Sequence, residues 1–399
     1  MSERRMFFNM KMFYFFAYFG FGSLFPLLSV YLQEEVGLRG SQIGVITSIG
    51  PIVMILVQPI WGMLSDVTKK PRLLLTFSVI GAGAVGFSYI FTDNYAVLVA
   101  VAAGVAVFQS AMIPLSDSMA MSYVRQHGGD YGSIRMWGAA GFAIAVWLMG
   151  TLSDLYGMQV IFYGFFIVLL ISGYFAIGMP KETETTKVDL KNGLKKLTKI
   201  PEFMIFLIVT FLVFGPIMAN NFYFGLLIQF AGGTLAGVGL AFLLAAGSEI
   251  PFMRVAGTWI SRIGILGVLL IAAGASAVRW LYYGSGPSHE WIYVTTIIQG
   301  LSIGLFVPAA LQYVSDLAPP EVKVTAVAIY SAMGNGVGAW FFSISAGMIM
   351  EWYSIISVYV FYGIMTGCGA LLTLWMLYRQ KKYGKPSVEG PVELNVKEN

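Results

Sequence analysis

Four ionisable residues interrupt long apolar stretches of the 399-residue sequence: Asp117, Arg135, Glu249 and Arg279. A charge at the centre of a bilayer costs about 2.5–3.5 kcal/mol even on permissive scales, so each one needs a partner or a function. Carboxylates and guanidinium groups can bind a polar solute, and a carboxylate can carry a proton. With two histidines and one cysteine, the chain has no evident metal-ligand set and no disulfide framework.

The elements that must hold these charges are apolar segments of membrane-spanning length. The chain is 57% hydrophobic and 11% charged, whereas soluble domains carry roughly 25% charged residues. A bilayer core needs about 20 apolar residues per helix. Twelve stretches meet or approach that length: 12–32, 43–65, 73–92, 95–123, 134–153, 158–179, 203–230, 235–253, 263–284, 291–315, 324–350 and 352–378. The sequence therefore predicts an all-α membrane protein with twelve transmembrane helices.

The positions of the basic residues predict which way the chain crosses the membrane. All but three of the 24 Lys and Arg residues fall in the termini or in alternate loops. Lys and Arg that flank spans mark the cytoplasmic face. We therefore expect a multi-pass protein of the cell (plasma or inner) membrane with both termini in the cytoplasm.

The two halves of the sequence share features at a nearly constant offset. Pro114 precedes Pro308 by 194 residues, and Gly150 precedes Gly347 by 197. An acid follows each of these glycines four residues later, at Asp154 and Glu351. Each pair joins one span to the sixth span after it, which indicates an internal repeat. We predict two pseudo-symmetric six-helix bundles, at residues 1–179 and 202–378. A cytoplasmic linker at 180–201 joins them, and a cytoplasmic tail follows at 379–399.

Two such bundles joined by a charged linker resemble the major facilitator superfamily, whose binding site lies between the halves. The segment from Gly62 to Arg72, with Asp66 and Lys70 between them, resembles the signature loop between spans two and three of that superfamily. The resemblance implies that these four residues gate the cytoplasmic side, with the aspartate capping a neighbouring helix. The alternative is an ordinary interfacial acid beside a basic loop.

Asp117 and Arg135 are the strongest candidate pair. Their midpoint is residue 126, inside the predicted loop 125–130, so an antiparallel hairpin would place both at similar depth. Opposite charges in contact favour each other's ionised form. The pair either binds substrate or is a static structural ion pair.

The residues around this pair carry a more specific resemblance. The segments 114–117 and 130–138 resemble the phenylpropionate permease branch of the superfamily and its relative lactose permease. In lactose permease an acid and an arginine with the same 18-residue separation contact sugar, which implies substrate binding by Asp117 and Arg135. It also implies that Phe142, seven residues after the arginine, stacks on the solute. The histidine and glutamate of the lactose permease proton step align with Gln299 and Ser302, so neither that proton mechanism nor galactoside specificity is implied.

Glu249 and Arg279 resemble a glutamate of span eight and an arginine of span nine in lactose permease. The sequence shows no basic partner at the depth of Glu249, and an unpaired buried carboxyl favours its protonated form. This predicts a proton-coupling role for Glu249 and Arg279, together with Asp117. A structural hydrogen bond is the alternative for Glu249, and snorkelling to water is the alternative for Arg279. Neutral polar residues expected to line the substrate cavity are Asn220, Asn221 and Gln299.

These features together predict a proton-coupled symporter that works by alternating access. Its solute would be a sugar or glycoside, an aromatic carboxylate or a nucleoside. The proton gradient would replace any cofactor, because the sequence has no Gly-x-x-x-x-Gly-Lys-Ser/Thr motif for ATP. The expected partners are the solute, the proton and the lipid bilayer, without nucleic acid or metal, and the resemblance implies a monomer. Drug–proton antiport is the alternative, followed by a passive channel or a membrane-embedded enzyme.

Overall fold

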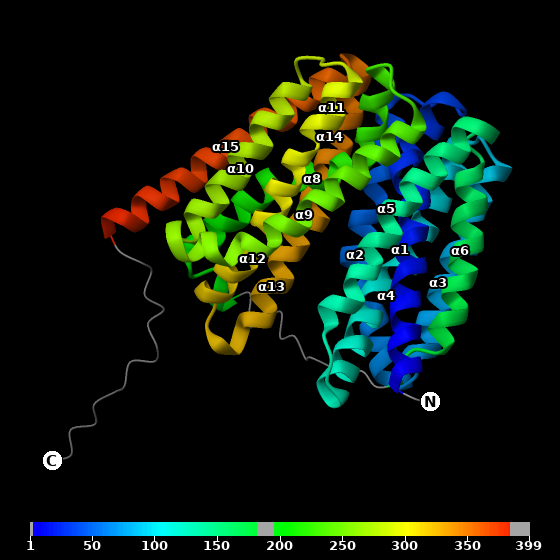
Figure 1. Cartoon of the computed structure of the whole chain (residues 1–399), viewed down its shortest axis with the longest axis horizontal. Coiled ribbons are helices and arrows are strands. Elements are labelled where there is room, and N and C mark those ends of the chain that lie inside the picture. The colour runs from blue at the N-terminus through cyan, green and yellow to red at the C-terminus, as the bar shows by residue number, and fades with distance from the viewer. Residues whose placement is uncertain (1–2, 182–194, 384–399) are drawn as a thin grey trace.

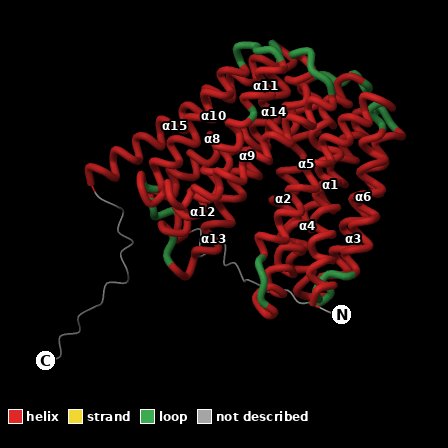
Figure 2. Tube along the Cα trace, viewed as in Figure 1, coloured by secondary structure: helices red, strands yellow, loops and turns green. Residues whose placement is uncertain are grey.

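The computed structural model describes residues 3–181 and 195–383, and the regular elements within these ranges are all helical (Figure 2). Twelve helical stretches in these ranges are long and apolar enough to cross a bilayer. The predicted all-α architecture and its number of spans are confirmed.

The helices follow the predicted spans and often run past their ends. The first six spans are α1 (Glu3–Glu34), α2 (Gly40–Thr68), α3 (Pro71–Phe87) with η1 (Ser88–Phe91), α4 (Tyr95–His127), α5 (Tyr131–Tyr156) and α6 (Val160–Ile177). The second six are α8 (Pro201–Phe230), α9 (Leu235–Ile263), α10 (Ile265–Tyr283), α11 (His289–Thr295) with α12 (Ile297–Leu317), the segment η2 (Pro320–Val322), α13 (Lys323–Ser331), η3 (Ala332–Gly338) and α14 (Ala339–Trp352), and α15 (Ile355–Tyr383).

The hairpin of α4 and α5 shows how local sequence sets this geometry. Gly128 and Gly129 take φ values of 76° and 111°, which side chains with a Cβ rarely adopt. Asp130 then caps α5, because its carboxylate accepts from the backbone N–H groups of Gly132 and Ser133, both at 2.9 Å. A tight turn and a firm helix start therefore fix the relative depth of residues on the two helices.

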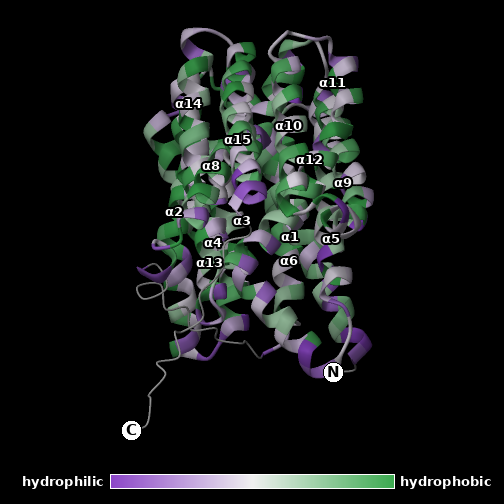
Figure 3. Ribbon diagram, turned by 90° about the vertical axis from the view of Figure 1, so that its left-hand side faces the viewer, coloured by the Kyte–Doolittle hydropathy of each residue, from purple (hydrophilic) through white to green (hydrophobic). Residues whose placement is uncertain are grey.

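The helices form two groups, with α1 to α6 in one and α8 to α15 in the other (Figure 1). The groups diverge toward the end that carries the N-terminus, called here the terminal end. They meet at the opposite end, the closed end, where Gly40 packs against Gly347 and Gly150 packs against the Leu235 carbonyl. The prediction of two six-helix bundles is confirmed. Figure 3 shows that apolar residues dominate the middle of the helices, with hydrophilic residues gathered toward the terminal end.

The predicted bundle boundaries remain a prediction. Most of the linker 180–201 and most of the tail 379–399 lie outside the described residues. Within the described part, α15 continues to Tyr383, beyond the predicted start of the tail.

Candidate functional site

The α4–α5 hairpin brings Asp117 and Arg135 into contact, as their spacing predicts. Nη1 of Arg135 lies 3.1 Å from Oδ1 and 3.4 Å from Oδ2 of Asp117. The side chains are 40% exposed for Arg135 and 27% exposed for Asp117. The pair is therefore compensated in charge and reachable from outside the packed core, while its role in binding substrate remains a prediction.

Two tyrosines of α1 complete this cluster. The hydroxyl of Tyr14 donates to Oδ1 of Asp117 at 2.5 Å. The guanidinium carbon of Arg135 lies 4.8 Å from the ring centroid of Tyr18, within range of a cation–π interaction. The hydroxyl of Tyr18 is buried and has no hydrogen-bond partner among the described residues. The charged residues alone do not reveal either tyrosine, but their i, i+4 spacing puts both on one face of α1.

Phe142 lies away from this cluster, at the contact between the two bundles. Its ring meets that of Phe242 on α9 edge-on, with centroids 5.9 Å apart and an interplanar angle of 74°. The rings that lie over Arg135 are those of Tyr14 and Tyr18 instead. In this conformation Phe142 helps to join the bundles, and its stacking on a solute remains a prediction.

A second charged cluster lies in the other bundle, around Arg279 on α10. Arg279 is 1% exposed, so the alternative in which it snorkels to water is wrong. Its Nη1 donates to Oε1 of Gln299 on α12 at 2.6 Å, and its Cζ lies 3.9 Å from the Trp280 ring centroid. Its Nε and Nη2 find no hydrogen-bond partner in the described part of the chain. The cation is buried and bonded to a neutral amide.

Glu249 on α9 belongs to the same cluster. Arg279 interacts with it electrostatically and is a basic neighbour that the sequence did not reveal. Within residues 3–181 and 195–383 it forms no ion pair, because no cation comes within 4.0 Å of its carboxylate oxygens.

The amides predicted to line the cavity have different environments. Asn220 is 1% exposed, and its Oδ1 accepts from the Tyr359 hydroxyl at 2.8 Å. Gln299 is held by Arg279, so both amides are bonded within their own bundle. Asn221 is half-buried, with part of its surface accessible. Solute binding by these three residues remains a prediction.

The predicted gating loop lies at the terminal end. Gly62, Asp66 and Lys70 are exposed, and open space surrounds the Gly62 Cα. The Asp66 side chain makes no hydrogen bond or ion pair with any described residue, so its predicted helix cap is not formed in this conformation. The Nε of Arg72 is buried without a partner in the same ranges. A gating role for these residues stays a prediction.

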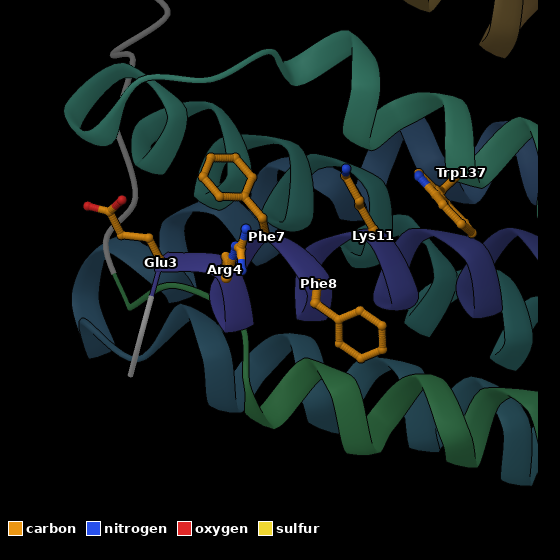
Figure 4. A pocket seen from close by; sticks show the side chains of 6 residues that line it. All are labelled: Glu3, Arg4, Phe7, Phe8, Lys11 and Trp137. Carbon is orange, nitrogen blue, oxygen red and sulfur yellow. The ribbon is translucent and has the colours of Figure 1, made fainter.

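Cavities are present at two places in the described part of the chain. One of about 460 Å³ lies at the terminal end, lined by Glu3, Arg4, Phe7, Phe8, Lys11 and Trp137. Figure 4 shows Lys11 and Trp137 on the same side of α1, and Trp137 is two residues from Arg135 on α5. The other, of about 30 Å³, is lined by residues of both bundles, including Gln109, Thr47 and Phe222.

Twelve membrane spans in two bundles, with a reachable ion pair inside the first, define a polytopic membrane transporter. A profile of the MFS_1 like family matches residues 7–361. The chain belongs to this family of the major facilitator superfamily, and it is a secondary transporter and not an enzyme.

Individual relatives support this assignment over almost the whole chain. Maltose permease of Geobacillus stearothermophilus is 47% identical over 94% of this chain and 95% of its own length. The uncharacterized transporter YwbF of Bacillus subtilis is 44% identical over 96% of each chain. The crystal structure of the nucleoside transporter NupG superposes with a TM-score of 0.82, covering 93% of this chain and 99% of that one. At 17% identity, the last likeness concerns the fold alone.

The predicted resemblance to the phenylpropionate and lactose permeases is also confirmed, at lower similarity. A probable 3-phenylpropionic acid transporter of Escherichia coli is 24% identical over 85% of this chain and 90% of its own length. Lactose permease of Klebsiella oxytoca is 21% identical over 90% of this chain and 91% of its own length.

Proposed function

We propose that this transporter is a proton-coupled symporter for a sugar, with maltose as the first solute to test. The 47% identity to a maltose permease over nearly the full length of both chains supports a sugar as the solute. Both termini would lie in the cytoplasm, as the positions of the basic residues predict.

The observation that carries this proposal is the half-exposed pair of Asp117 and Arg135. Neighbouring sugar hydroxyls can donate to a carboxylate and accept from a guanidinium at the same time, and charge-assisted hydrogen bonds are stronger than neutral ones. The ring of Tyr18, whose centroid lies 4.8 Å from the guanidinium carbon of Arg135, offers an aromatic surface for the carbon face of a sugar. A charged pair beside an aromatic ring matches the chemistry of a carbohydrate.

Glu249 is our candidate for the proton-carrying group, with Arg279 as its regulator. A buried carboxyl that lies near a cation without bonding to it can change protonation when that distance changes. A shift of α9 relative to α10 within the second bundle would alter the distance between Glu249 and Arg279 and so favour proton release or uptake. Asp117 is the second titratable candidate, because it also contacts the solute in this proposal.

The loop with Gly62, Asp66, Lys70 and Arg72 would close the terminal end once the bundles rock together. The exposed, unengaged carboxylate of Asp66 in the present conformation is compatible with a partner that arrives only on closure. Asp66→Asn should slow sugar uptake while leaving equilibrium sugar binding within about twofold. Loss of binding together with transport would instead indicate a folding defect.

Uptake by purified protein in proteoliposomes tests the main proposal. With an imposed proton gradient, labelled maltose should accumulate above its external concentration, and a protonophore should abolish that accumulation. Arg135→Ala should remove both the uptake and the thermal stabilisation that maltose gives the parent protein. Arg262→Ala is a matched control, because it removes an arginine in the last turn of α9 instead of the paired one.

The same assay separates the alternatives. Accumulation that persists after the gradient is collapsed would overturn the coupling. Stabilisation by xanthosine or 3-phenylpropionate, and not by any sugar, would overturn the solute class. Drug resistance that is lost on gene deletion, without any change in sugar uptake, would favour drug–proton antiport.

A further inference from the structure

Two carboxylates at the closed end each bind the start of a helix in the opposite bundle. Asp154, near the end of α5, accepts from the backbone N–H of Leu235 at 3.1 Å and of Ala236 at 2.8 Å. Glu351, near the end of α14, accepts from the backbone N–H of Ser41 at 2.8 Å. Leu235 and Ala236 open α9, and Ser41 is the second residue of α2.

The two contacts are equivalent under the internal repeat. The acids lie on α5 and α14, which are the fifth and eleventh spans. The helix starts that they bind belong to α9 and α2, which are the eighth and second spans. Asp154 and Glu351 are 197 residues apart in the sequence, and the starts of α2 and α9 are 195 apart. Each bundle therefore gives one carboxylate and receives one, so the arrangement is reciprocal.

Each contact suits the chemistry of a helix start. The first N–H groups of a helix have no partner within it, and the helix dipole places partial positive charge there. A carboxylate that binds these groups from another helix acts as an N-cap supplied by the opposite bundle. Because each cap needs α5 against α9, or α14 against α2, it exists only while the bundles are together at this end.

Glycines beside each acid allow this approach. A Cβ on Gly150 would collide with the Leu235 carbonyl oxygen, and one on Gly347 would collide with the Gly40 carbonyl oxygen. Each glycine lies one helical turn before its acid. Backbone contact at the glycine therefore places the carboxylate directly over the N–H groups of the opposing helix.

We infer that Asp154 and Glu351 form a twin latch that holds the closed end shut and must release on both sides before that end can open. The inference rests on alternating access and not on the identity of the solute. Opening would remove both caps together, because both cross the same interface between the bundles. The open state would then leave both helix starts to water.

Distance measurements between the bundles test the latch without any substrate. Spin labels at Asp93→Cys and Ser285→Cys, in a Cys368→Ser background, report the separation of the bundles at the closed end by pulsed electron resonance. Each of Asp154→Ala and Glu351→Ala should raise the ratio of open to closed molecules about fivefold, the size expected for loss of a helix cap. The double variant should raise it about twenty-five-fold if the two caps act independently.

Controls separate the latch from a general loss of structure. Glu34→Ala removes a carboxylate at the same end that makes no hydrogen bond or ion pair to the other bundle in the described chain, and it should leave the ratio unchanged. Asp154→Asn keeps an acceptor for the N–H groups and should restore most of the closed population. An unchanged ratio in the double alanine variant, in protein that still unfolds cooperatively, would overturn the latch.

A disulfide provides an independent measurement. Asp154→Cys with Ala236→Cys, again without Cys368, should cross-link α5 to α9 across the closed end. Cross-linked protein should lose transport at least tenfold, and a reductant should restore it. Transport at the parent rate with the disulfide intact would show that the closed end does not have to open there.

Discussion

The two bundles hold their buried charges in opposite ways. In the first bundle, Arg135 bonds to the Asp117 carboxylate at 3.1 Å, and both side chains keep part of their surface exposed. In the second bundle, Arg279 is almost fully buried and bonds to the neutral amide of Gln299. Glu249 interacts with this cation electrostatically but forms no ion pair with it. One cluster is compensated and reachable, and the other is an uncompensated cation inside the protein.

This difference suggests that the two clusters have different functions. Asp117 and Arg135 are both partly exposed, so a solute can replace their mutual bonds at a lower cost than in a sealed core. A buried charge without an opposite charge is far more expensive. Ionisation of a nearby carboxylate therefore stabilises the Arg279 cation, so the protonation of Glu249 depends on its distance from Arg279. Binding would belong to the first cluster and proton coupling to the second.

The largest expected effect is that of Asp117→Asn on transport. The variant loses the charge that Arg135 and Tyr14 bond to, and charge-assisted hydrogen bonds contribute about 1.5–3 kcal/mol each. The initial rate of sugar uptake and counterflow in proteoliposomes should both fall by about 100-fold. Near-parent counterflow would remove the first cluster from the binding site.

Glu249→Gln should distinguish the proton-coupling function of the second cluster from solute binding by the first. An amide cannot release a proton, so sugar accumulation driven by a proton gradient should fall at least about tenfold. Counterflow, which needs binding and rocking but no net proton movement, should stay within about twofold of the parent. A variant that loses both activities equally would assign Glu249 to solute binding instead.

Gln299→Leu should act on stability more than on binding. It removes the acceptor of a fully buried cation, and an unsatisfied buried donor costs about 1–3 kcal/mol. The midpoint of thermal unfolding in detergent should therefore fall by several degrees. Gln299→Glu is the matched control, since its carboxylate can still accept from Arg279, and it should be more stable than the leucine variant. Equal stability of all three proteins would contradict the view that the hydrogen bond from Arg279 to this side chain stabilises the buried cation.

The smallest expected effect is that of Tyr14→Phe. Its hydroxyl bonds to Asp117, so its loss should weaken the apparent sugar affinity about fivefold, or about 1 kcal/mol. Tyr18→Phe removes a hydroxyl without a partner in the described chain, and it should change the affinity less than twofold. Equal effects of the two variants would show that ring packing, and not the hydrogen bond, is what matters.

The sequence by itself determined the helices, their number, the repeat and the depth of the first ion pair. These follow from local rules: bilayer thickness sets the length of an apolar run. In the same way, the loop at Gly128 and Asp130 sets the register of one hairpin. Asp117 and Arg135 could be paired because they lie on helices adjacent in the chain.

Only the tertiary structure decided the contacts between helices distant in the chain. Tyr14 reaches Asp117 across 103 residues, Asp154 reaches Leu235 across 81, and Glu351 reaches Ser41 across 310. In a lipid-facing bundle nearly every helix is apolar around most of its surface, so hydrophobic periodicity gives little information about which face meets which neighbour. Close packing at glycines and the pairing of buried polar groups made that choice, because each unpaired polar group in a membrane is costly.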